Sequence, residues 1–211
     1  MNIRKFIPVN TMIGAIAVAL LVLPAGPPAA AVEPTTYPVV IVGDSIIDRT
    51  RAAYSSKYLI DAAAGRGLGF PGVSDPGLPA DVSGIEAVRR SIPLIEPGGW
   101  LVVELGTNDI SQQVTTGLFL AQMQVVTDLL PDDRCLVWVL PWRERRYDRA
   151  LVYQSLIGQG VREQPCWRLV AWSAVNRQIP ALFQADGIHP TEAGGLVLAA
   201  MIRTAISGGG V

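Results

Sequence analysis

The sequence has little of several residue types that common functions require. It holds one histidine and two cysteines in 211 residues, which leaves no cluster of the ligands that transition metals prefer. It also has no basic excess, because 17 lysines and arginines face 18 acids and the formal net charge is −1. A chain without a basic stripe is a poor candidate for nucleic-acid binding. We therefore expect neither a metal centre nor a nucleic-acid partner.

The only long apolar run is too short to span a membrane comfortably. This uncharged run, residues 12–23, follows Arg4 and Lys5 and leads into a stretch rich in proline and alanine. A positive start, a short apolar run and small residues are typical of a secretory signal peptide. We therefore expect a signal peptide over residues 1–31, one domain over residues 32–211, and a secreted or cell-envelope location. An uncleaved N-terminal anchor is the alternative.

Residues 32–211 alternate between two kinds of pattern. Short apolar and β-branched runs predict strands at residues 39–42, 58–62, 100–105, 135–140 and 167–172. Helical or largely polar segments predict helices at residues 48–57, 84–95, 118–130, 143–161 and 191–206. Strands that alternate with helices imply a parallel sheet with helices on both faces. The expected fold is a single three-layer α/β/α domain.

The two cysteines each precede a predicted strand. Cys135 starts the fourth strand, and Cys166 comes just before the fifth. In an exported protein an isolated pair favours a disulfide, and the geometry fits if those strands are parallel neighbours. Two separate buried thiols are the alternative.

Three polar stretches fall at the carboxyl ends of strands or before the last helix. They are Gly43-Asp44-Ser45, Gly106-Thr107-Asn108-Asp109 and Asp186-Gly187-Ile188-His189-Pro190. Open α/β sheets bind ligands at the carboxyl ends of their strands. Each stretch alone could be ordinary turn or helix-cap chemistry. Together they bring a serine, an amide, a carboxylate and the only histidine toward one end of the sheet.

Those residue types suit nucleophilic catalysis by serine. Ser45 would attack, His189 would accept the hydroxyl proton, and Asp186 would hold the imidazole tautomer. Acyl transfer also needs donors for the developing oxyanion. Asn108 has a side-chain amide, while Ser45 and Gly65 offer backbone N–H groups.

At this point the chain resembles the SGNH (GDSL-type) esterase and lipase superfamily. The three stretches are similar to that family's first, third and fifth blocks, in order and spacing. Its second block is matched best by Asp61-Ala62-Ala63-Ala64-Gly65-Arg66, with Gly67 as an alternative glycine. The resemblance implies a flavodoxin-like sheet of five parallel strands in the order 2-1-3-4-5. It also implies that Ser45, Gly65 and Asn108 form the oxyanion hole. That order makes strands four and five neighbours, which supports the Cys135–Cys166 bridge.

Substrate contacts are assigned to Asp44, Arg66 and Trp142. Trp142 could stack on a sugar, wall an acyl pocket or pack at the surface. The arginines just past the fourth strand form a solvated helix face or a lip for an anionic substrate; they are Arg143, Arg145, Arg146 and Arg149. A dinucleotide loop at residues 65–69 is disfavoured because Pro71 and Gly72 follow where a helix should begin.

The resulting prediction is an exported, cofactor-independent serine esterase that acts through an acyl-enzyme. A short acyl group such as O-acetyl on a cell-envelope carbohydrate is the expected substrate, with a monomer as the expected state. The alternatives are an O-acyltransferase to cell-wall polysaccharide with the same triad, and a catalytically inactive envelope-binding module.

Overall fold

The computed structural model of the chain describes residues 35–73, 81–162 and 166–208. Within them, five strands form one parallel sheet in the order β2-β1-β3-β4-β5. The strands are β1 Tyr37–Gly43, β2 Tyr58–Ala62, β3 Ile95–Glu104, β4 Cys135–Val139 and β5 Arg168–Val170. The expected fold class and strand order are confirmed. The expected signal peptide, residues 1–31, lies outside the described residues.

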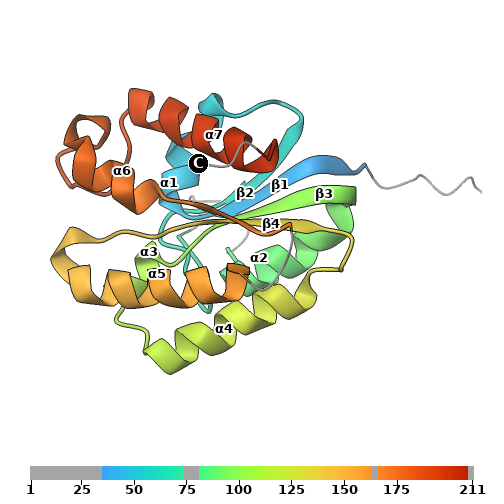
Figure 1. Cartoon of the computed structure of the whole chain (residues 1–211), viewed down its shortest axis with the longest axis horizontal. Coiled ribbons are helices and arrows are strands. Elements are labelled where there is room, and N and C mark those ends of the chain that lie inside the picture. The colour runs from blue at the N-terminus through green and yellow to red at the C-terminus, as the bar shows by residue number, and fades with distance from the viewer. Residues whose placement is uncertain (1–34, 74–80, 163–165, 209–211) are drawn as a thin grey trace, which may run out of the picture. The chain divides into compact units, whose positions relative to one another are not determined.

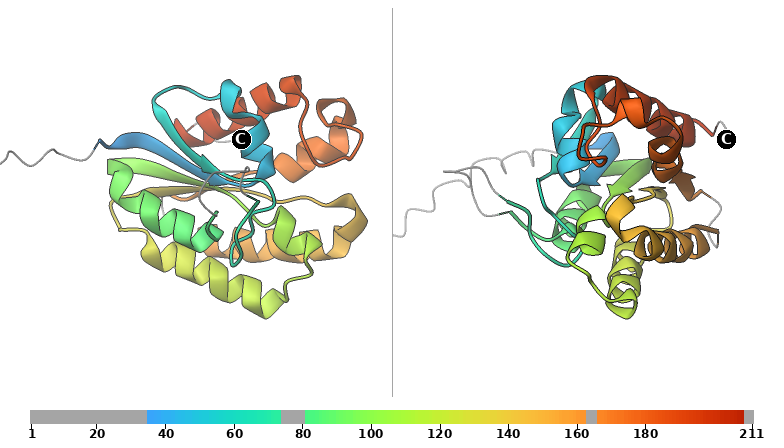
Figure 2. Two further views of the ribbon diagram at one scale, coloured as in Figure 1. Left: turned by 180° about the vertical axis from the view of Figure 1, so that it is seen from behind. Right: turned by 90° about the vertical axis from the view of Figure 1, so that its left-hand side faces the viewer.

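Helices cover both faces of this sheet, as Figures 1 and 2 show. The α-helices are α1 Ser45–Arg49, α2 Gly84–Ser91, α3 Thr107–Ser111, α4 Thr116–Leu129, α5 Tyr147–Arg162, α6 Trp172–Gln178 and α7 Glu192–Ile206. Short 3-10 turns are Arg51–Ala53, Ile92–Leu94, Glu144–Arg146 and Pro180–Leu182. In Figure 1, α7, α1 and α6 lie above the sheet, and α2, α4 and α5 lie below it. No helix in the described part of the chain is long and apolar enough to cross a membrane.

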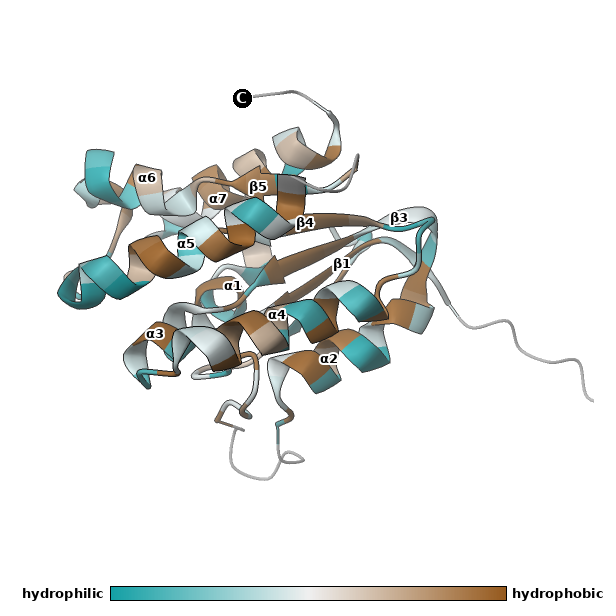
Figure 3. Cartoon of the chain, turned by 60° about the horizontal axis from the view of Figure 1, so that its bottom comes forward, coloured by the Kyte–Doolittle hydropathy of each residue, from teal (hydrophilic) through white to brown (hydrophobic). Residues whose placement is uncertain are grey.

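The alternating side chains of β1 build the two cores. Val40 and Val42 pack into the core under α2, α4 and α5, whereas Val39 and Ile41 pack into the core under α1 and α7. All four are at most 3 % exposed, as expected of a strand buried on both faces. Figure 3 shows apolar strands between helices that carry both apolar and polar residues.

The structure corrects several element boundaries. The helix predicted at residues 48–57 begins instead at Ser45, directly after the strand, and ends at Arg49. The predicted helix 84–95 ends at Ser91 and continues as a 3-10 turn around Pro93, as expected of a proline that removes a backbone donor. β3 begins five residues earlier than predicted, and α6 was not predicted.

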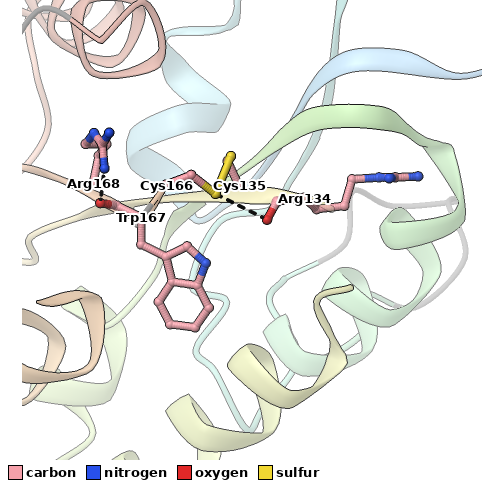
Figure 4. Close-up of a disulfide and its surroundings, with 5 residues drawn as sticks. All are labelled: Arg134, Cys135, Cys166, Trp167 and Arg168. Carbon is pink, nitrogen blue, oxygen red and sulfur yellow. Dashed lines mark hydrogen bonds between the residues drawn. A yellow bond between two sulfur atoms is a disulfide. The ribbon is translucent and has the colours of Figure 1, made fainter. Parts of the chain in front are cut away.

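The disulfide between Cys135 and Cys166 is present, which confirms that prediction. Its Cα atoms lie 5.3 Å apart, and it joins the amino-terminal ends of the neighbouring strands β4 and β5 (Figure 4). It therefore lies at the end of the sheet opposite to the predicted catalytic residues.

Candidate active site

The turn between β1 and α1 presents Ser45 at the carboxyl end of the sheet. Asp44 caps α1, because its Oδ1 accepts a hydrogen bond from Ile46 N at 2.9 Å. Asp44 N donates to Glu104 O at 3.2 Å, which ties the turn to the end of β3. A Cβ at Gly43 would lie 2.5 Å from Ile47, so glycine is needed for this close turn. Ser45 is thus the first residue of a helix that its neighbours hold in place.

The structure brings the three predicted triad residues together. Ser45 Oγ lies 2.9 Å from His189 Nε2, and His189 Nδ1 lies 2.6 Å from Asp186 Oδ2. With its proton on Nδ1, His189 donates to Asp186 and leaves Nε2 to accept from the Ser45 hydroxyl. This is the hydrogen-bond order that a serine nucleophile requires.

The loop that carries Asp186 and His189 is closed on itself. Gln184 N donates to His189 O at 2.8 Å, and Gly187 N donates to Gln184 O at 2.9 Å. Asn176 Nδ2 on α6 donates to Gly187 O at 2.8 Å. Thus α6, which the sequence did not predict, steadies the loop that positions the imidazole.

The Asp186 carboxylate is held in its ionised form. Partial burial raises its pKa, but hydrogen bonds from the His189 ring and from the backbone N–H groups of His189 and Ile188 outweigh that effect. Together they lower the pKa of Asp186 to about 2. Asp186 therefore remains an acceptor for the imidazole at any pH near neutrality.

Two backbone N–H groups at this end of the sheet, those of Ser45 and Gly65, have no hydrogen-bond acceptor among the described residues. Neither Ser45 N nor Gly65 N donates a hydrogen bond to any residue in the described segments. Gly67 N, by contrast, donates to Phe70 O at 3.2 Å. Gly65 adopts φ +76, which favours glycine, and it follows β2, whose Ala62 is paired with Gly43. Of the two glycines considered from the sequence, Gly65 is the one with a donor to offer.

Asn108 lies near the same place but its amide is occupied. Its Nδ2 donates to Asp44 Oδ2 at 2.8 Å and to Arg66 O at 3.0 Å. Both amide hydrogens are therefore used in this state. Asn108 can donate to an oxyanion only by releasing one of these two bonds.

Two residues predicted to contact substrate lie under the site instead. Asp44 is fully buried, and Arg66 is 1 % exposed. The Arg66 guanidinium pairs with Asp61 and Asp81 and donates to Asp61 O at 2.8 Å. Burial acts to lower its pKa, but the two carboxylates raise the pKa of Arg66 above its ordinary value. The structure corrects this assignment: these side chains support the turns around the site and present no surface to a substrate.

Trp142, the third predicted contact, is 6 % exposed. It packs edge-on against Tyr147, and the Arg177 guanidinium carbon lies 5.5 Å from its ring centroid. It borders a hollow of about 380 Å³ together with Phe183 and Gly187. Trp142 therefore forms a wall beside the Asp186 loop but offers no open ring face for stacking.

Two buried acids beneath the site were not assigned a role from the sequence. Glu104 is 1 % exposed; its Oε2 accepts from Asp44 N at 3.3 Å, and its carboxyl shares a hydrogen bond with that of Asp44. Asp109 is fully buried and accepts from Leu68 N at 3.1 Å. Burial raises the pKa of Asp109 to about 6 and of Asp44 to about 6, and it raises the pKa of Glu104 well above 4.5. In the sequence, the feature that could have identified Glu104 is its position as an acid at the end of an apolar strand.

No group of three or more histidine, cysteine or acidic residues in the described segments is arranged to hold a metal ion.

Comparisons with known proteins agree with this fold. No protein-family model matches the sequence, and no curated protein matches it. The structure is similar to the C-terminal catalytic domain of the peptidoglycan O-acetyltransferase OatA from Streptococcus pneumoniae, at 15 % identity and a TM-score of 0.64, covering 82 % of this chain and 94 % of that one.

Two esterases are also similar. The acetylxylan esterase Axe2 from Geobacillus stearothermophilus matches at 15 % identity and a TM-score of 0.53, over 82 % of this chain and 95 % of that one. The esterase EstA from Pseudoalteromonas sp. matches at 12 % identity and a TM-score of 0.55, over 81 % and 96 %. The chain thus has the fold of SGNH-type hydrolases.

Proposed function

We propose that the chain is an exported serine esterase that removes a short acyl group, such as O-acetyl, from a cell-envelope carbohydrate. The observation that carries this proposal is the continuous hydrogen-bond chain from Ser45 through His189 to Asp186. The similarity to an acetylxylan esterase and to a peptidoglycan O-acetyltransferase domain supports ester chemistry on carbohydrate. The disulfide and the signal-like N-terminus support export.

The proposed reaction proceeds in two halves. Ser45 Oγ attacks the ester carbonyl carbon while His189 Nε2 takes its proton, and the carbonyl oxygen becomes an oxyanion. The N–H groups of Ser45 and Gly65 donate to that oxygen. Collapse of the intermediate expels the alcohol, which takes the proton from His189, and leaves an acyl group on Ser45. Water then repeats the sequence, with His189 as base, and releases the carboxylic acid and free Ser45. No cofactor enters either half.

An O-acyltransferase is the second candidate. In that reaction a sugar hydroxyl replaces water in the second half, and the first half is unchanged. The structural similarity to the OatA domain favours this alternative. The difference between the two reactions lies in whether an acceptor excludes water from the acyl-enzyme.

The test is release of 4-nitrophenol from acetate and longer-chain esters by the wild-type protein and by Ser45→Ala. We expect activity that is greatest with acetate and that falls by at least about a thousandfold in Ser45→Ala, because no other group can form the acyl-enzyme. Ser55→Ala, an exposed serine outside the site, is the matched control and should retain full activity. Addition of oligosaccharide acceptors then separates transfer from hydrolysis.

Undiminished activity in Ser45→Ala would refute the triad. If no ester is cleaved, labelling with a serine-reactive phosphonate decides between the remaining possibilities. Labelling of Ser45 would indicate a specialised transferase, and no labelling of the folded protein would indicate the inactive envelope-binding module.

A further inference from the structure

Three hollows share lining residues: two lie beside the Asp186 loop, and the third lies at the start of α5. The first is the 380 Å³ hollow beside Trp142 and Arg177. The second, of about 340 Å³, is bounded by Arg143, Arg145 and Asp186. The third, of about 600 Å³, is bounded by Arg145, Arg146 and Arg149 among others. Glu144 borders all three and Asp186 of the triad lines the second, so we treat the three hollows together as one groove.

Five arginines line this groove, which we call the arginine groove: Arg143, Arg145, Arg146, Arg149 and Arg177. Three acids line it as well, namely Glu144, Asp148 and Asp186. Asp186 is already engaged by His189. The groove therefore has two more cationic than anionic side chains, in a chain whose formal net charge is −1.

None of these five arginines forms an ion pair with an acid in the described segments, although Glu144 and Asp148 are their sequence neighbours. Five other arginines do pair with carboxylates: Arg51, Arg66, Arg89, Arg90 and Arg134. Arg149 is instead anchored to Val114 O, and Arg177 lies over Trp142. The unpaired guanidinium groups can take anionic partners without first breaking an ion pair.

Three separate parts of the chain contribute arginines to the groove, and all three lie at one end of the sheet. Its arginines lie in the turn after β4, in the first turn of α5 and in α6, which all lie at the left in Figure 1. This is the end to which the strands point and at which Ser45 lies. Three hollows in series, each lined by at least one arginine, fit an extended ligand with repeated negative charges better than a small ester.

We propose that the arginine groove binds the anionic groups of a polyanionic glycan, so that an acyl group on a neighbouring sugar reaches Ser45. This inference rests on the proposed function and narrows its substrate class to acylated glycans that carry carboxylate or phosphodiester groups. Guanidinium groups recognise both anions through paired N–H donors. The groove contributes to substrate binding, and the triad performs the bond exchange already described.

The test uses matched substrates and a charge-reversal variant. An oligouronide and the same oligosaccharide with its carboxyl groups reduced to alcohols are acetylated in parallel, and acetate release is measured. The wild-type protein should have a higher kcat/KM for the anionic substrate. In Arg145→Glu/Arg146→Glu, which changes two exposed residues, the anionic-to-neutral ratio of kcat/KM should fall about tenfold, carried by KM.

The control reverses two charges elsewhere. In Lys57→Glu/Arg203→Glu both residues are exposed and neither borders the groove, so the ratio should keep its wild-type value. Raising the salt from 0.05 to 0.5 M shortens the Debye length from about 14 to about 4 Å, so it should lower the wild-type ratio. An acetylated glycosyl phosphodiester in place of the oligouronide distinguishes phosphodiester from carboxylate recognition.

A wild-type ratio near one for both anions, or a ratio unaffected by Arg145→Glu/Arg146→Glu, would overturn the inference. Ser45-dependent cleavage of neutral esters without any charge preference would leave the proposed function standing. Affinity of Ser45→Ala for the non-acetylated oligouronide and phosphodiester, with and without the arginine reversals, gives a readout that does not depend on turnover. No binding of either anion, or binding that the reversals do not weaken, would again count against the groove.

Discussion

The carboxyl pair beneath the nucleophile should make the folded state less stable as the pH rises. Asp44 and Glu104 are buried, share a hydrogen bond and lie directly under Ser45. A bond between two carboxyl groups requires a proton. Burial and the neighbouring Asp44 charge raise the pKa of Glu104 well above 4.5, so Glu104 holds that proton. In the unfolded chain the same carboxyl releases it at an ordinary pKa.

The substitution Glu104→Gln removes the proton-binding step at this position while keeping the shape of the side chain. Glutamine has the shape of a protonated glutamate, so its oxygen can still accept from Asp44 N and its amide can donate to the Asp44 carboxylate. It does not need to bind a proton to fold. Over the pH range in which folded Glu104 is protonated and unfolded Glu104 is ionised, the contribution of Glu104 to wild-type stability falls by about 1.4 kcal/mol per pH unit. The variant lacks that contribution.

We therefore expect the difference in unfolding free energy, Glu104→Gln minus wild type, to grow with pH. Between pH 5 and pH 7 the growth should approach about 3 kcal/mol, which is two pH units at one proton. The assay is urea unfolding of both proteins at half-unit steps of pH, followed by tryptophan fluorescence. Glu96→Gln removes an acid from the same strand outside the buried pair and should keep the wild-type slope.

A difference that does not change with pH would refute this reasoning. It would mean that Glu104 gains no proton on folding and that the two carboxyl groups are not hydrogen-bonded to each other. A variant that is merely less stable by a constant amount at every pH would have the same meaning, so the outcome does not depend on how well glutamine packs.

Two further predictions concern stability. Arg66→Met should lower the unfolding free energy by about 3–5 kcal/mol in denaturant melts, because it removes the buried cation that pairs with Asp81 and Asp61, although Asp61 keeps its pair with Arg90. The exposed pair Arg89–Glu86 is the control, and Arg89→Met should cost less than about 1 kcal/mol; equal losses would contradict the structural role of Arg66. Reduction of Cys135–Cys166 opens a loop of 31 residues and should lower stability by about 3–4 kcal/mol. An unchanged melting temperature after complete reduction would contradict that prediction.

Local patterns predicted the parts of this protein that depend on near neighbours. The last helix was predicted to begin at residue 191, and Thr191 caps it, because its Oγ1 accepts from Gly194 N at 3.2 Å. The proximity of Ser45 to His189 was also predicted, from the position of Ser45 at a strand end and of His189 before the last helix. The strand order came from the resemblance to a known family, not from spacing alone.

The errors arise where distant residues decide the outcome. Residues 97–99 were left between the predicted helix 84–95 and the predicted strand 100–105, but Gly98 N donates to Asp133 O and the segment lies within β3. α6 has no side-chain cap at its start, so no N-cap signal marks it. Arg66 was assigned to substrate, but it pairs with Asp61 and Asp81, which are five and fifteen residues away. Such pairings cannot be deduced from periodicity.

Side chains around the turn after β2 hold it in place without using the backbone N–H of Gly65. Asp109 binds Leu68 N, Arg66 donates to Asp61 O, and Asn108 donates to Arg66 O, so the turn after β2 is held on both sides of the glycine. The turn is thus fixed without using Gly65 N. The supports of this turn are buried, whereas the arginine groove is largely exposed. Mutations under the turn should therefore change stability and turnover together, and mutations in the groove should change substrate preference alone.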